Sequence, residues 1–75
     1  MIAEIRERIL EAAHENRKMA MFHYQVLLNS AELLNYDPAE FCTAVGVPES
    51  YATEFRKMLS LAAVMRDSNS RIVEA

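Results

Sequence analysis

The amino-acid sequence predicts an all-α fold, a compact bundle of three to four helices. The composition is that of a globular chain, because 52% of the 75 residues are hydrophobic and only one is glycine. Strong helix formers, chiefly Ala, Leu, Met and Glu, dominate over β-branched residues. Apolar residues recur at helical spacing between three breaks, at 35–38, 46–48 and 67–70. A chain of this length is expected to form a single domain over residues 1–75.

The first half of the chain is expected to form two helices, over about residues 2–15 and 17–34. Ile5 and Ile9 lie on one face of the first helix. The polar run 14–17 indicates either a turn or the middle of one bent helix, and both alternatives stay open. The second helix is apolar over a wide arc, which is typical of a helix at the centre of a bundle or of one that presents a second face to a partner.

Clear start and stop signals define a short third helix. Asp37 is expected to cap its N-terminus, Pro38 fits the first helical position, and Glu40 lies three residues after the cap. Gly46 is expected to end the helix with a left-handed residue. The helix is therefore only about eight residues long.

A fourth helix is expected from residue 48 or 49 to about 66. The polar tail 67–75 that follows is expected to be loosely ordered. The predicted inward stripe of the fourth helix consists of Ala52, Phe55, Leu59 and Ala62.

The segment from about 37 to 66 has the spacing of a helix-turn-helix within the predicted bundle. Counted from Pro38, a small residue stands at the fifth position and glycine at the ninth, where a tight turn needs it. Apolar residues stand at the fourth, eighth, tenth, fifteenth and eighteenth positions. This pattern resembles the helix-turn-helix family over about 20 residues, and the alternative is an ordinary helical hairpin. The residues that carry the resemblance are Phe41, Cys42, Val45, Gly46, Val47, Ala52 and Phe55.

A DNA-binding member of that family uses the exposed N-terminal residues of the second helix to reach base edges in the major groove. Here Ser50, Thr53 and Lys57 are the residues that could do so. Glu49 and Glu54 lie among them, and the formal net charge of −3 gives the chain a negative field that opposes DNA binding. A sequence-specific DNA-binding repressor, acting as a dimer, is therefore the alternative function rather than the first.

Protein binding is the function that the sequence favours. The supply of apolar residues exceeds what the core of so short a chain needs, and methionine is common on adaptable binding surfaces. The alternative is that these residues complete the core or form a homodimer interface. The residues predicted to contact a partner are Tyr51, Glu54, Met58 and Leu61, with Tyr24 and Leu28 as second choices.

Residues 41–51, in so short and acidic a chain, resemble the small antiactivators of rhizobial quorum sensing. Those bacterial proteins bind transcriptional activators and hold the transfer of conjugative elements in check. The resemblance implies that the partner is a transcription factor, an activator that this chain inhibits. It assigns no role to any single residue.

The sequence offers no set of residues for catalysis or metal binding. Its single cysteine, Cys42, has no disulfide partner in the chain and is expected to be buried as a small apolar residue. His14 and His23 do not make up the three or four converging ligands of a metal site. Without a nucleophile–base set or a phosphate-binding loop, neither an enzyme nor a cofactor nor a small-molecule substrate is expected. Because no signal peptide or membrane-spanning run is evident, the protein is expected in the cytoplasm, away from membranes.

Overall fold

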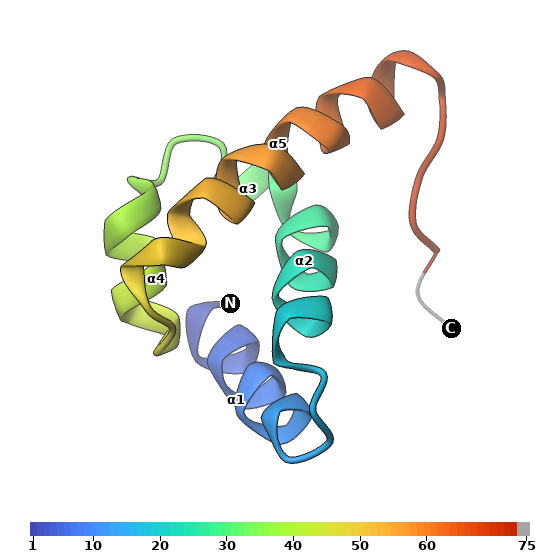
Figure 1. Cartoon of the computed structure of the whole chain (residues 1–75). Helices are drawn as coiled ribbons and strands as arrows, with labels where there is room; N and C mark the ends of the chain where they lie inside the picture. Colours follow the sequence, from blue (N-terminus) through green and yellow to red (C-terminus); the bar gives the residue numbers. More distant parts are fainter. Residues whose placement is uncertain (74–75) are drawn as a thin grey trace.

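The computed structural model describes residues 1–73, and every regular element within them is helical. Figure 1 shows these helices gathered into one bundle, from which the last helix extends to one side. The arrangement confirms the predicted all-α fold. The elements are α1 (Ile2–Ala13), α2 (Lys18–Leu28), α3 (Ser30–Leu33), α4 (Pro38–Val45), the 3-10 turn η1 (Glu49–Tyr51) and α5 (Ala52–Asp67).

Residues 14–17 form a turn, so α1 and α2 are separate helices. Asn16 has a positive φ of 58°, a conformation that asparagine tolerates better than most residues. The N–H of Arg17 donates to the carbonyl oxygen of Ala12 at 2.9 Å and so closes the end of α1. Of the two alternatives for this polar run, the turn is therefore correct.

The predicted second helix is interrupted at Asn29, so the expectation of a continuous helix over 17–34 is wrong in its C-terminal part. The side-chain amide of Asn29 donates to the carbonyl oxygen of Gln25 at 2.9 Å. The main-chain N–H of Asn29 donates to the same carbonyl oxygen at 3.0 Å, but its φ of −105° and ψ of 20° depart from helical values. As a result, α2 ends at Leu28, and the single turn α3 follows.

Helix α4 begins and ends where the sequence predicts. The carboxylate of Asp37 accepts a hydrogen bond from the main-chain N–H of Glu40 at 3.0 Å. Gly46 has a φ of 78°, and just past it the N–H of Val47 donates to the carbonyl oxygen of Cys42 at 3.0 Å. This left-handed closure turns the chain toward α5. The residues after the turn form η1 rather than the first turn of the expected α-helix.

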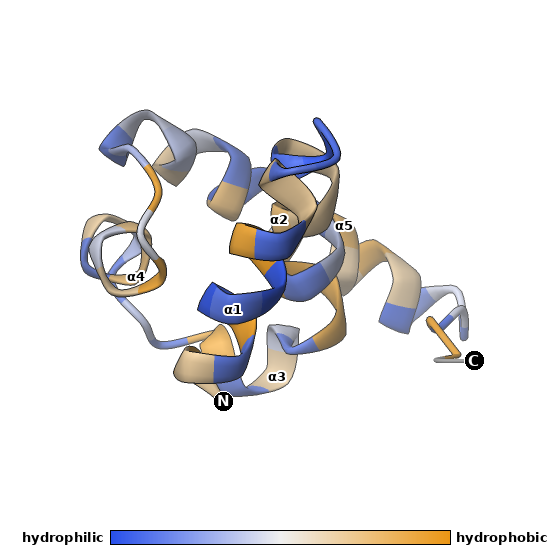
Figure 2. Ribbon diagram, turned by 90° about the horizontal axis from the view of Figure 1, so that it is seen from below, coloured by the Kyte–Doolittle hydropathy of each residue, from blue (hydrophilic) through white to orange (hydrophobic). Residues whose placement is uncertain are grey.

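Three phenylalanine rings tie α2, α4 and α5 together in the core. The ring centroids of Phe22 and Phe41 lie 5.9 Å apart, those of Phe41 and Phe55 lie 4.8 Å apart, and all three side chains are fully buried. Helix α1 packs against α2 and α4, and Figure 2 shows hydrophobic and hydrophilic positions alternating along it, as expected of a helix with one buried stripe. The apolar residues of the predicted helix-turn-helix framework are all buried, namely Phe41, Cys42, Val45, Val47, Ala52 and Phe55.

Cys42 is a packing residue, as expected from the sequence. It is fully buried in α4. Burial raises the pKa of its thiol, the carboxylate of Glu49 raises it further, and the guanidinium of Arg56 lowers it. A thiol that stays protonated at neutral pH is a poor nucleophile and a poor metal ligand.

Helix α5 is the longest element, and its second half lies away from α4, beside α2 and α3 (Figure 1). After Asp67 the chain turns back, with Asn69 at a φ of 57° and the N–H of Ser70 donating to the carbonyl oxygen of Met65 at 2.7 Å. No helix within residues 1–73 combines the length and the apolar character needed to cross a bilayer. The last two residues of the tail predicted to be loosely ordered lie outside the described residues.

The turn after α4 yields a stability prediction. A Cβ added at Gly46 would lie 3.7 Å from Nε of Arg6, which is an ordinary contact. The cost of Gly46→Ala therefore comes from the left-handed backbone, and we expect the free energy of unfolding to fall by about 1 kcal/mol. Gly46→Asn should cost less, because asparagine tolerates this conformation. Urea unfolding measures both variants, and an alanine variant as stable as the unmodified protein would contradict the prediction.

Candidate interaction surface on α2 and α5

Two of the residues predicted to contact a partner, Tyr51 and Met58, pack inward. The ring of Tyr51 is partly buried and meets Phe22 edge-on at a centroid separation of 5.1 Å. The ammonium of Lys18 lies 5.6 Å from the centroid of the Tyr51 ring, within the range of a cation–π contact. Met58 is partly buried and packs against the core. These two side chains therefore help to hold η1 and α5 on the bundle.

Glu54, a third predicted contact residue, bridges α5 and α2. Its Oε1 lies 2.8 Å from Nε2 of His23, and its Oε2 lies 3.2 Å from Nζ of Lys57. Because an ionised carboxylate only accepts hydrogen bonds, Nε2 of His23 is the donor. The hydrogen bond from His23, with that from Lys57, lowers the pKa of the Glu54 carboxyl from its ordinary value, against the opposing effect of burial. The carboxylate is thus engaged with α2 rather than free on the outer face of α5.

Of the other three predicted contact residues, one is exposed and one lines a hollow. Leu61 is 41% exposed. Tyr24 and Leu28, both on α2, are partly buried. Leu28 lines a hollow between α2 and α5 together with Ala62 and Met65. The structure therefore joins Leu28 to the second half of α5, whereas the three residues described above are occupied by contacts within the chain.

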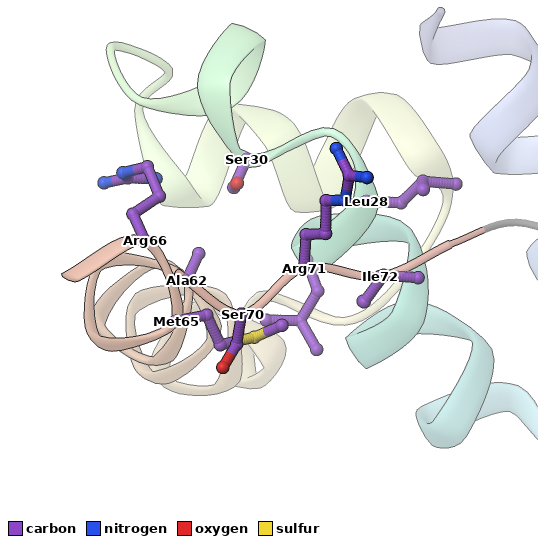
Figure 3. A pocket seen from close by; sticks show the side chains of 9 residues that line it. Leu28, Ser30, Ala62, Met65, Arg66, Ser70, Arg71 and Ile72 are labelled. Carbon is purple, nitrogen blue, oxygen red and sulfur yellow. The ribbon is translucent and has the colours of Figure 1, made fainter. Parts of the chain in front are cut away.

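Sequence reasoning missed Val64 and the shape of the hollow. Val64 is 59% exposed and follows Leu61 by three residues, so the two side chains are neighbours on the surface of α5. The apolar run 61–65 was the available signal, because a helix on a bundle cannot bury such a run on every side. Figure 3 shows that the returning tail, with Ile72, completes the wall of the hollow. No sequence pattern indicated this wall, since it depends on the turn at Asn69.

The residues considered for DNA contact form a separate polar strip on η1 and the first turns of α5. Ser50, Thr53 and Lys57 are all exposed, as a DNA-binding helix requires. Arg56 is exposed as well and adds a second cation. Glu49 remains exposed in the same segment, whereas Glu54 is turned toward α2.

The chain matches a family model described as an HTH-like domain, over residues 1–68. The protein belongs to the HTH-like domain family. No curated protein and no solved structure gives a significant match. Because the matched residues run from the start of α1 to the end of α5, the HTH-like domain comprises the whole bundle and not only the α4–α5 segment.

Membership of the HTH-like domain family indicates a transcription-related regulator, and families of this kind are not typically enzymatic. The resemblance to a helix-turn-helix domain is therefore confirmed. Within residues 1–73, no group of three or more His, Cys, Asp or Glu side chains is placed to hold a metal ion. The protein partner and the antiactivator role stay predictions.

The bridge between α2 and α5 predicts a pH-dependent contribution to stability. Glu54→Gln should lower the free energy of unfolding at neutral pH, because the amide cannot replace the ionised acceptor that binds His23 and Lys57. The pKa of the Glu54 carboxyl is lowered in the folded state. The carboxylate therefore adds to the free energy of unfolding at pH values above the pKa that Glu54 has in the unfolded chain. This added stability is lost as the pH falls through the pKa that Glu54 has in the folded protein. The difference in stability between the two proteins should therefore vanish in acid.

Urea unfolding at a series of pH values measures this difference. Glu32→Gln, at an exposed carboxylate on α3, gives the background effect of the same substitution. A Glu54→Gln variant whose deficit stays constant from neutral to acidic pH would contradict the assigned role of the carboxylate.

Proposed function

We propose that this HTH-like domain regulates transcription by binding a transcriptional activator and inhibiting it. The observation that carries the proposal is the pair of exposed apolar side chains, Leu61 and Val64, on the second half of α5. The first half of α5 holds the helix on the bundle, and the second half meets the partner. The helix-turn-helix then acts as a scaffold for a protein-binding surface.

The continuity of the apolar surface on α5 supports this proposal. Single exposed apolar residues are common on protein surfaces, but Leu61 neighbours both Val64 and Met65 on α5, and Met65 lines the hollow. Full burial of a Val or Leu side chain contributes about 1.5–3 kcal/mol. Two such side chains would supply a substantial part of the roughly 8 kcal/mol of a micromolar complex.

The charge of the chain supports a protein partner over DNA. Eleven acidic residues against eight Lys and Arg residues give the net charge of −3. A negative field slows the approach of DNA, whereas an apolar contact with a protein does not depend on a cationic surface.

The apolar surface yields a prediction for partner binding. Leu61→Asp and Val64→Asp should each reduce recovery of the activator by affinity capture at least about fivefold, because a carboxylate in an apolar contact loses its hydration. The same variants should fail to inhibit a reporter gene driven by that activator. Affinity capture from a lysate of the native host cells, followed by mass spectrometry, identifies the activator for both measurements.

Leu10→Asp is the matched control, because Leu10 is 57% exposed and lies on α1, which packs against α2 and α4. This variant should capture the activator as the unmodified protein does. Circular dichroism checks that all three variants are folded. Full capture by folded Leu61→Asp and Val64→Asp variants would show that the proposed surface is wrong.

DNA binding is the second candidate function, and one observation favours it. The bridge to His23 draws the carboxylate of Glu54 toward α2, where it also pairs with Lys57, and Ser50, Thr53 and Lys57 stay exposed for a duplex. These residues stand where a DNA-binding helix-turn-helix places its base contacts.

A mobility-shift assay separates the two candidates. With duplex promoter fragments at about 50 mM salt and micromolar protein, we expect no shift. A shift that weakens steeply as the salt concentration rises, and that Lys57→Ala reduces, would establish the DNA-binding function instead.

A further inference from the structure

We propose that the hollow between α2 and α5 binds an acidic amphipathic helix of the protein partner. This inference rests on the proposed function and specifies the chemistry of the partner segment. An apolar side chain of that helix enters the hollow, and carboxylates on its flanks pair with Arg66 and Arg71.

The floor of the hollow is apolar and adaptable. Leu28 of α2 lies across it from Ala62 and Met65 of α5, and Ile72 of the tail closes one side (Figure 3). Leu27 of α2 also lines the hollow. Methionine is flexible enough to adjust to the shape of an incoming side chain. An apolar anchor from the partner would therefore find a lining that can close around it.

The rim of the hollow is cationic. Figure 3 shows the side chains of Arg66 and Arg71 on either side of Ser30, and no acidic residue lines the hollow. Both arginines are exposed, and within residues 1–73 the structure gives neither of them an ion pair. Asp67 follows Arg66 in the chain but does not line the hollow, so the lining itself carries two cations and no carboxylate. Charge complementarity therefore favours an acidic partner segment and opposes a basic one.

The apolar surface continues from the hollow onto the outer face of α5. Met65 follows Leu61 by four residues, and Val64 follows it by three, so Leu61 lies beside both on the helix. Leu61 and Val64 are exposed, and Met65 is partly buried at the edge of the hollow. A partner helix with anchors on one face can cover such a strip while it fills the hollow, which is the helix-in-groove mode of recognition.

The test uses the full chain and a fluorescently labelled helical peptide of about 18 residues, with leucine on one face and glutamate on both flanks. A second peptide carries lysine in place of every glutamate. Fluorescence anisotropy should show that the glutamate peptide binds and that the lysine peptide binds at least about tenfold more weakly. Arg66→Glu/Arg71→Glu should reverse this preference, and Leu61→Asp should weaken both peptides.

Arg17→Glu is the control, because Arg17 is an exposed cation at the start of α2 and does not line the hollow. This variant should bind the glutamate peptide as the unmodified protein does. Equal affinity for the two peptides, or an equal loss in Arg17→Glu and Arg66→Glu, would overturn the inference. So would a duplex oligonucleotide that binds through Arg66 and Arg71 when the glutamate peptide does not.

The two proposals fail in different ways. If the Arg66→Glu/Arg71→Glu variant still captures the activator while Leu61→Asp does not, the inference of an acidic partner helix is wrong and the proposed function stands. If Leu61→Asp also captures the activator fully, the proposed function itself is wrong.

Discussion

Phe41 lies between Phe22 and Phe55, with ring centroids 5.9 and 4.8 Å away, and this contact joins α4 to α2 and α5. All three rings are fully buried, so they form the part of the core on which the relative placement of these helices depends. The left-handed Gly46 brings the chain back toward this cluster after α4. Once the first half of α5 is packed there, its second half is directed along α2 and α3, away from α4.

Much of this fold could be predicted from local signals. The cap at Asp37, the turn at Gly46 and the apolar spacing between them depend on a few neighbouring residues, and the structure confirms them. The break at Asn29 was not predicted, because asparagine in a helical pattern is only weakly unfavourable and the hydrogen bond to Gln25 becomes visible only in three dimensions. The return of the tail at Asn69 was not predicted either, because the hydrogen bond from Ser70 to Met65 becomes visible only in three dimensions.

The candidate surface was harder to predict than the fold. Apolar periodicity shows which residues share a face of α5, but it does not tell a packing residue such as Met58 from an exposed one such as Leu61. The contact of Glu54 with α2 could not be predicted either, because His23 is 31 residues away in the chain. The hollow depends on three separate segments, α2, α5 and the tail, so no single stretch of sequence could indicate it.

Helix α5 is thus divided into a first half that packs on the bundle and a second half that is exposed to a partner. Methyl NMR of the full chain, recorded with and without the captured activator, tests this division most directly. We expect the methyl resonances of Leu61, Val64 and Met65 to shift or broaden on binding, while those of Thr53 and Leu10 stay in place. Shifts confined to Thr53, on the polar strip at the start of α5, would contradict the account.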